Sequence, residues 1–567
     1  MIQTLITRLG NWNPQLFREL KGRLKPRNIL LASTISLLGQ FILFMSFQAQ
    51  LPTRLSGFQK IPNKYCTGET PYSLPECLSD GLGKVIINWQ LWSFDIFTWL
   101  SIIACFTLLV AGTYLLINDL ATEEQRDTLN FIRLSPQSPQ SILWGKMLGV
   151  PVLLYVAVLV ALPLNLWSGL NAKLSLSSIL IFYTVVVAAS FCYYSAALLF
   201  GLVGTWLGSF QAWLGSGALL GYLIFTKQAI APNFSADSPL TMLGLINPYF
   251  LIPSPNFNFK FIDRIPQFTN FNWFILPLGK DFITTIGFAL VVYFIGAYFI
   301  WQSLQRCFRV SNTTMLSKKQ SYLLTICFTL ITLGCANWQK LVFSYSHGYY
   351  VIHENIALLM ILNLGLILYL IAALIPSRQT LQDWARYRHI SYSKRLEQPS
   401  LLNDLIWGEK SPGILAIAIN ATIAITCISL LILLSHVSTD EKVNSLMALA
   451  FAGSLAIIYA ALTQLILFTK NEQRLLWATG VLIAVIVLPP ILLALFFSNP
   501  DNNSFVWLFS IAAPLIALSP PGDNTLSFAP FLAILGHFCI LTILVSQLTR
   551  KLQKAGESAT KALLAKN

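Results

Sequence analysis

The 567-residue sequence is 55% hydrophobic and 11% charged, with a mean hydropathy of +0.65. Soluble globular domains carry about 25% charged residues, so this composition excludes a soluble enzyme and a disordered scaffold. The 37 Lys and Arg against 23 Asp and Glu give a formal net charge of +14. In a membrane protein such an excess reports orientation rather than nucleic-acid binding. We therefore expect this protein to lie in the lipid bilayer and to have no nucleic-acid partner.

Twelve apolar segments are long enough to cross the hydrocarbon core, which needs about 20 residues. In chain order they are residues 29–47, 96–117, 147–167, 177–200, 208–228, 282–304, 321–337, 355–376, 413–435, 443–469, 475–497 and 526–548. A further segment, 505–521, is shorter and contains Pro514, Pro520 and Pro521, which indicates a re-entrant or half-length helix. The sequence therefore predicts an all-α polytopic membrane protein with about 12 transmembrane helices plus re-entrant or half helices.

The basic residues predict the orientation of these spans. With a cytoplasmic N-terminus, the cytoplasmic segments hold 26 of the 37 Lys and Arg and 11 of the 23 Asp and Glu, giving +15 inside and −1 outside. This asymmetry follows the positive-inside rule. If 505–521 crossed fully, Arg550, Lys551 and Lys554 would lie outside, against the rule. We expect a multi-pass protein of the plasma (inner) membrane with both termini cytoplasmic.

Cys66 and Cys77 share the first external loop, 48–95, whereas the other seven cysteines lie in or beside predicted spans. An oxidising compartment permits a disulfide between them. Two free thiols are the alternative, and the sequence leaves both open.

A short amphipathic helix is predicted before the first span. Asn13 is a good N-cap, and Pro14 suits the first helical position. One face of this helix is apolar and is surrounded by basic residues, which indicates a helix lying in the cytoplasmic headgroup layer. The apolar face consists of Leu16, Phe17, Leu20 and Leu24.

The connection between the second and third spans, residues 119–146, carries strong local signals. Thr122 and Gln125 have the spacing of a capping box. Glu123 and Glu124 follow Thr122, where the helix dipole favours anions. We therefore expect a helix to begin at Thr122.

A break and a second helix are expected further along this connection. Ser135-Pro136 ends the first helix, because the residue before a proline is pushed out of helical geometry. Ser138-Pro139 is an N-cap followed by proline, and the new helix continues through Gly145-Lys146 into the third span. The result is a cytoplasmic helical elbow, which either docks on a partner or serves as an ordinary connection.

This elbow resembles the coupling-helix signature of type-2 ABC exporter permeases, the ABC-2 family. The resemblance rests on residues 123–129, Leu134-Ser135-Pro136, Ile142 and Gly145-Lys146. One departure is Asp127, which stands where members of the family usually have glycine. Residues 13–309 also match the family's order of elements: interfacial helix, two spans, coupling helix, three spans, an external re-entrant segment and a sixth span.

The resemblance implies that this chain is the permease subunit of an ATP-driven exporter and is not itself an enzyme. A separate, dimeric, cytoplasmic ATP-binding cassette subunit would bind ATP and Mg. The chain has no Gly-x-x-x-x-Gly-Lys-Ser/Thr phosphate loop, and we expect no catalytic residue, metal site or cofactor within it. The residues to which the resemblance assigns coupling to the ATPase are Thr122, Glu123, Glu124, Arg126, Thr128, Leu129, Ser135, Pro136 and Lys146.

The second half of the chain is a weaker repeat of the first. Residues 403–410 precede a span as 13–21 do, and 471–474 resemble 123–126 but lack the Ser-Pro elbow. The sequence leaves open whether one chain forms the whole transmembrane domain or a second permease copy assembles with it. We divide the chain into an ABC-2-like half with six spans and the coupling helix (1–309), two spans plus a cytoplasmic linker (310–412), and a degenerate second half without a full coupling helix (413–567).

Two other functions stay open as alternatives. A multi-spanning glycosyltransferase or ligase acting on a lipid-linked sugar at an external loop would use a cluster of carboxylate or basic residues there. A secondary transporter would use ionisable groups at mid-membrane, where His537 is the one such group in the predicted spans. The candidate groups of the external loops are scattered along the chain: Asp80, Asp95, Asp263, Arg264 and Asp281. The apolar spans favour a lipid-like or amphipathic cargo.

Overall fold

The computed structural model shows an almost entirely helical chain. It describes residues 10, 12–52, 62–68, 74–80, 84–227, 237–253, 268, 271–310, 313–343, 348–393, 400–496, 504–518 and 528–564. Within these residues, β-structure is limited to isolated bridges. Ten helical runs in the described part are long and apolar enough to cross a membrane. The predicted fold class, an all-α polytopic membrane protein, is confirmed.

All twelve predicted spans overlap helices, although the separate spanning runs number ten. The helix expected to continue from Ser138 into the third span is interrupted by a turn at Val150 and Pro151, so this span begins at Val152. Segments 177–200 and 208–228 belong to a single run, because the 3-10 turn η2 (Gly204–Phe210) joins α9 (Leu176–Val203) to α10 (Gln211–Phe225). The other difference is α13 (Lys318–Gly334), which covers most of the predicted span 321–337 but has only 17 residues.

The segment 505–521 forms two short helices, α20 (Ser504–Trp507) and α21 (Ala513–Leu518). Neither helix is long enough to span the hydrocarbon core, in agreement with the expected half-length element. Pro520 and Pro521 lie outside the described residues.

The chain folds as two compact units. Unit 1 comprises Met1–Ala236, Leu243–Phe271 and Pro277–Trp301; unit 2 comprises Asp237–Met242, Asn272–Leu276 and Gln302–Asn567. The main boundary falls inside α12 (Phe282–Arg309), eight residues before the predicted boundary at 309. The predicted parts 310–412 and 413–567 both belong to unit 2, and the three-part division stays a prediction.

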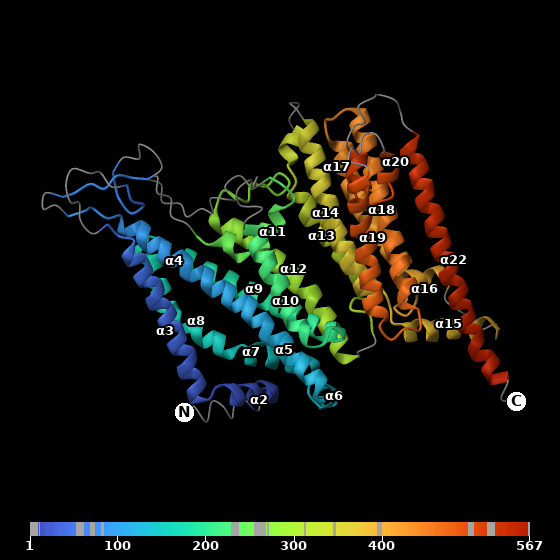
Figure 1. The fold of residues 1–567 in the computed structure, drawn as a ribbon, viewed down its shortest axis with the longest axis horizontal. Helices are drawn as coiled ribbons and strands as arrows, with labels where there is room; N and C mark the ends of the chain where they lie inside the picture. The colour runs from blue at the N-terminus through green and yellow to red at the C-terminus, as the bar shows by residue number, and fades with distance from the viewer. Residues whose placement is uncertain are drawn as a thin grey trace. The chain divides into compact units, whose positions relative to one another are not determined.

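In unit 1 the long helices run side by side, and α2 lies across one end of α3 (Figure 1). A π-helical turn, η1 (Thr107–Ala111), joins α4 and α5 into a continuous rod that packs on α9 and α10. Helix α8 packs on both α3 and α4. The bounds are α2 (Pro14–Arg23), α3 (Pro26–Ala49), α4 (Trp89–Phe106), α5 (Gly112–Gln125), α6 (Thr128–Arg133), α7 (Pro139–Gly149) and α8 (Val152–Asn171).

A buried amide fixes three of these helices against one another. Asn165 on α8 donates through Nδ2 to the Phe97 carbonyl (3.1 Å) and to Ser101 Oγ (3.0 Å) on α4. Its Oδ1 accepts the hydroxyl of Tyr183 on α9 at 2.7 Å. Because a buried polar group is costly when unpaired, this hydrogen bonding favours a single packing of α4, α8 and α9.

Between α10 and α12 the chain forms the short helices α11 (Thr241–Ile246) and η4 (Pro248–Leu251), where the sequence predicts a re-entrant segment. Three tyrosines of the long helices hold this segment through its backbone carbonyls. Tyr222 donates to the Leu243 carbonyl (2.7 Å), and Tyr193 and Tyr293 donate to the Ile246 carbonyl.

In unit 2, α18 packs on α14, α17, α19, α21 and α22, whereas α15 lies across the bundle end and packs on α22 (Figure 1). Between α18 and α19 there is only the short connection 468–473, so this half has no elbow helix there, in agreement with the sequence. The bounds are η6 (Gln339–Phe343), α14 (Gly348–Leu374), α15 (Arg378–Ser393), α16 (Leu401–Trp407), α17 (Ile414–Leu434), α18 (Thr439–Leu467), α19 (Arg474–Phe496) and α22 (Ala529–Leu564).

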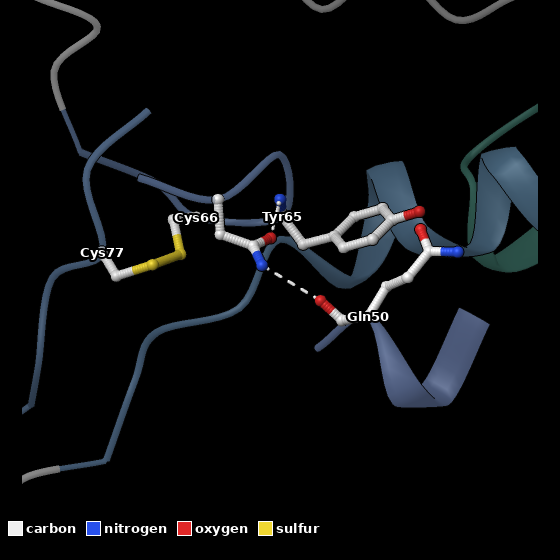
Figure 2. Close-up of a disulfide and its surroundings, with 5 residues drawn as sticks. Gln50, Tyr65, Cys66 and Cys77 are labelled. Carbon is white, nitrogen blue, oxygen red and sulfur yellow. Dashed lines mark hydrogen bonds between the residues drawn. A yellow bond between two sulfur atoms is a disulfide. The ribbon is translucent and has the colours of Figure 1, made fainter. Parts of the chain in front are cut away.

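Cys66 and Cys77 are joined by a disulfide in the connection between α3 and α4 (Figure 2). Next to the bridge, Tyr65 is buried and donates its hydroxyl to Asp95 on α4 at 2.9 Å. Burial and this hydrogen bond raise the pKa of the Tyr65 phenol above its usual value, so the phenol stays a donor at neutral pH. The disulfide-bonded segment is therefore anchored to the start of the second span.

The disulfide predicts the number of reactive thiols. In denatured, unreduced protein we expect a maleimide to label seven of the nine cysteines, and all nine after reduction. Mass spectrometry of the labelled chain checks both numbers. A Cys66→Ala variant should expose Cys77 and label at all eight remaining cysteines without reduction. Nine labels on the unreduced wild type would contradict the bridge.

Candidate functional site

Helix α2 packs closely on α7. Asn13 caps α2 as predicted, since its Oδ1 accepts from the Leu16 amide (3.0 Å), and its Nδ2 donates to the Ser141 carbonyl (2.7 Å). Two glycines of α7 permit this approach: a Cβ on Gly145 would lie 2.8 Å from the Leu16 nitrogen, and one on Gly149 would lie 2.5 Å from Glu19 Cβ. Such distances are too short for a real Cβ, so the glycine of the Gly145-Lys146 pair has a packing role.

The face of α2 that is buried inside the protein consists of Gln15, Leu16 and Glu19. The predicted apolar face of Leu16, Phe17, Leu20 and Leu24 shares only Leu16 with it, and its place in the headgroup layer stays a prediction. The buried polar side chains are paired within α2, because Gln15 donates to Glu19 at 3.0 Å and Arg23 contacts Glu19 at 3.2 Å.

Six charged side chains from three helices form a cluster beside α7. Lys146 Nζ on α7 contacts Asp119 Oδ2 (2.7 Å) and Glu123 Oε2 (2.6 Å) on α5. From α2, Arg23 contacts Asp119 and Arg18 contacts Glu123, each at 2.6 Å. We call this set the three-helix ion cluster; its members are Arg18, Glu19, Arg23, Asp119, Glu123 and Lys146.

Burial makes the pairing in this cluster obligatory. Lys146 has no exposed side-chain surface, and the side chains of Asp119 and Glu123 are 16% and 11% exposed. A buried charge is tolerated only when it is paired, and here three cations face three carboxylates. The carboxylate oxygens of Glu19, Asp119 and Glu123 lie within 4.8 Å of one another, a spacing that also suits a metal ion. In this structure the positive charge beside the three carboxylates comes from Lys146, Arg18 and Arg23.

The first helix of the elbow does not begin at Thr122, so that prediction is wrong. Helix α5 continues from the span to Gln125, and the Thr122 hydroxyl donates to the Asn118 carbonyl inside it at 2.7 Å. The capping-box pattern is a local signal, and a helix that arrives already formed supplies acceptors for the amides the cap would serve. Buried Leu116 and Leu120 hold this end of α5 in the core.

The chain turns sharply at Asp127, which has φ 55° and ψ 11°. This left-handed conformation is strained for most side chains, is tolerated by Asp and Asn, and is easy for glycine. The backbone at residue 127 therefore favours glycine, the residue that ABC-2 proteins usually carry at the position that Asp127 resembles. Thr128 supports the turn by donating its hydroxyl to the Glu123 carbonyl at 3.1 Å.

Helix α6 points one face inward and the other into open space. Leu129 and Ile132 are buried, whereas Phe131 is 79% exposed and Leu134 is 85% exposed. After α6, the Ser135 hydroxyl donates to the Ile132 carbonyl at 2.7 Å, and the chain breaks at Pro136 as predicted. Helix α7 then begins with Ser138 as N-cap, again as predicted.

The nine residues assigned to coupling therefore occupy different environments. Glu123 and Lys146 belong to the ion cluster, Leu129 is buried, and Thr122, Thr128 and Ser135 make local hydrogen bonds. The remaining three lie on the outer side of the elbow: Arg126 and Pro136 are exposed, and Glu124 is half-buried.

The sequence interpretation missed several residues of this site. The i, i+4 spacing of Glu19 with Arg23 is a signal for an ion pair on one helix face, and the same spacing of Asp119 with Glu123 places two carboxylates on one face that need cations from elsewhere. Phe131 and Leu134 are large apolar residues in a charged connection, a signal for exposed anchors. Their exposure depends on which face of α6 packs inward, and that is decided by tertiary contacts.

The structure describes four of the groups considered for the alternative functions. Asp95 pairs with Lys64 at 2.5 Å, and Asp80 accepts from the Lys84 amide at 2.9 Å. Mid-membrane His537 is hydrogen-bonded through Nδ1 to Ser454 at 2.8 Å. Asp281 is exposed; Asp263 and Arg264 lie outside the described residues.

Comparison of the chain with protein-family models, with curated proteins and with solved structures finds no match. Function is therefore inferred from the residues and contacts described above.

Replacing Lys146 by Met should destabilise unit 1. The change leaves two buried carboxylates with fewer partners, and breaking a buried ion pair from one side costs about 3–5 kcal/mol. We expect a clear fall in the unfolding temperature of the purified protein in detergent. Lys25→Met, which removes the same charge from an exposed position, should leave this temperature unchanged. An equal fall of the unfolding temperature in both variants would show that the buried ion pairs of Lys146 do not stabilise the protein.

The turn at Asp127 predicts an unusual order of stability among variants. Asp127→Gly should be neutral or stabilising by up to about 1 kcal/mol, because glycine adopts positive φ freely. Asp127→Val should destabilise by about 1–2 kcal/mol through backbone strain. Unfolding in detergent measures both, and a valine variant as stable as the glycine variant would be inconsistent with the left-handed turn.

Proposed function

We propose that this chain is the permease subunit of an ATP-driven exporter, and that a separate ATP-binding cassette subunit docks on α6. The observation that carries the proposal is the exposure of Phe131 (79%) on the short helix α6 and of Leu134 (85%) directly after it, where buried Leu129 and Ile132 hold the helix. Large apolar side chains presented in this way are suited to a groove in a partner. The sequence around them is the part of the chain that resembles the coupling helix of ABC-2 permeases.

The contacts of α6 suit it to transmit force. It follows α5 after the tight turn at Asp127, and α5 is the end of the rod formed by α4, η1 and α5. The three-helix ion cluster fastens α5 to α2 and α7. A displacement of α6 by a closing ATPase would therefore move these helices together rather than bend one connection.

The proposed orientation places α2, α6 and α7 in the cytoplasm, where a cassette subunit has access to ATP and Mg. It rests on the excess of Lys and Arg in the segments assigned to this side, 26 of 37. A dimeric cassette offers two equivalent docking grooves, and the connection 468–473 lacks an elbow helix. We therefore favour an assembly in which a second permease copy supplies the second elbow.

Affinity purification from the native cell in mild detergent tests this proposal. The wild-type chain should retain a cassette ATPase, identified by mass spectrometry and by ATP hydrolysis. Phe131→Glu combined with Leu134→Glu should reduce the retained ATPase at least about tenfold, because loss of an interface anchor typically costs more than 1.4 kcal/mol.

A control is Leu402→Glu, which introduces one negative charge at a leucine that is 65% exposed on α16. It should leave the retained ATPase unchanged, and all variants should keep the wild-type unfolding temperature because the substituted side chains are exposed. If the wild type retains no ATPase, or if both variants lose it equally, the docking role of α6 is refuted.

A further inference from the structure

Unit 2 contains a cavity of about 650 Å³ at the end of its bundle where α15 crosses α22. Helices α15, α16, α17, α18 and α22 all contribute lining residues. This volume lies in the usual range of ligand sites, about 300–1,000 Å³. It is distinct from the elbow of unit 1 and has no part in the proposed docking of an ATPase.

The inner part of the cavity is apolar and follows membrane-spanning helices. Leu541 and Val545 line it from α22, and Leu415 and Ala418 line it from α17. Along α22 the lining extends from Leu541 to Gly556, which corresponds to about 22 Å at 1.5 Å per residue. Half of the hydrocarbon core is about 15 Å thick, so the cavity matches the depth of one leaflet plus its headgroup layer.

The other end of the cavity is polar and basic. Arg388 and His389 of α15 line it together with Thr549 and Gln553 of α22. The described lining residues include no carboxylate. Asp404 contacts the Arg388 Nε at 3.4 Å and accepts from the Trp384 Nε1 at 2.5 Å, which fixes the orientation of both side chains at this end.

Further positive charge surrounds this end. Arg550, Lys551 and Lys554 are exposed on the same turns of α22, whereas Arg386 of α15 is exposed outside the cavity lining and pairs with Asp383 at 3.6 Å. The nearby carboxylates are Asp404, which contacts Arg388, and Glu557 of α22. Arg388, Arg550, Lys551 and Lys554 therefore outnumber these two carboxylates. The mouth of the cavity thus carries a net positive charge.

A buried lysine holds the wall of the cavity in place. Lys318 Nζ, at the start of α13, donates to the Leu405 carbonyl and to Ser411 Oγ, each at 2.6 Å. It also reaches the carbonyl of Pro412 at 3.2 Å. Leu405 and Pro412 line the cavity, so this lysine ties that part of the wall to the start of α13.

We propose that this cavity binds an anionic phospholipid of the surrounding membrane. One acyl chain occupies the apolar part between α17 and α22, and the phosphate lies at Arg388 and His389. Basic pockets between transmembrane helices are suited to anionic headgroups, and the apolar depth excludes a free phosphate as the natural occupant. A zwitterionic lipid would fill the same apolar part without using the excess of positive charge at the mouth.

Lipid retention by the full-length protein tests this inference. The protein is purified in mild detergent, and co-purified phosphatidylglycerol and phosphatidylethanolamine are counted per chain by mass spectrometry. We expect Arg388→Gln to lower the retained phosphatidylglycerol at least about fivefold relative to phosphatidylethanolamine, because a charge-assisted contact is worth more than 1 kcal/mol. Arg388→Lys should restore most of the retention.

The matched control is Arg386→Gln, which removes the same charge from the exposed side of the same helix and should not change retention. A second variant, Ala418→Trp, fills the apolar part and should expel the lipid while Arg388 is intact. Size-exclusion chromatography and the unfolding temperature show whether each variant is folded, and the Lys variant distinguishes loss of charge from loss of fold.

A thermal shift assay on delipidated protein separates the sources of phosphate. Phosphatidylglycerol should raise the unfolding temperature of the wild type and not that of Arg388→Gln, whereas inorganic phosphate should raise neither. Equal loss of phosphatidylglycerol in Arg386→Gln, loss of both lipids alike in Arg388→Gln, or stabilisation by inorganic phosphate alone would overturn the assignment. Unchanged retention in Ala418→Trp would also overturn it.

Discussion

The buried Lys146 and its two carboxylates, Asp119 and Glu123, are the interaction on which the candidate site depends. A lysine without exposed surface requires partners, and those partners come from α5, while the lysine comes from α7. The arginines of α2 complete the pairing from a third helix. Because charges of opposite sign must stay together in this environment, α2, α5 and α7 have a single relative arrangement.

That arrangement determines what the elbow presents. Gly145 and Gly149 let α2 lie close to α7, and this closeness brings Arg18 and Arg23 within reach of α5. The turn at Asp127 then directs α6 so that Leu129 and Ile132 are buried and its other face is exposed. The exposed face is thus a consequence of a buried ion cluster and of one left-handed residue.

Unit 2 also contains a buried lysine, but with different partners. Lys318 binds backbone carbonyls and a serine rather than carboxylates, and the connection between α18 and α19, residues 468–473, contains no elbow helix. The amphipathic α15 packs across α22 and leaves a cavity with a basic mouth and an apolar interior. The two units therefore expose different features: an apolar face on the elbow in unit 1 and a cavity with a basic mouth in unit 2.

The sequence by itself determined the features that local chemistry dictates: the apolar spans, the caps at Asn13 and Ser138, the break at Ser135-Pro136 and the short segments near 505–521. Tertiary structure decided the rest. The capping box at Thr122 was overruled because α5 arrives there already helical. The partners of Lys146, the exposure of Phe131 and the cavity at Arg388 depend on which helix faces pack together. Hydrophobicity cannot reveal this in a membrane protein, because lipid-facing and buried positions are equally apolar.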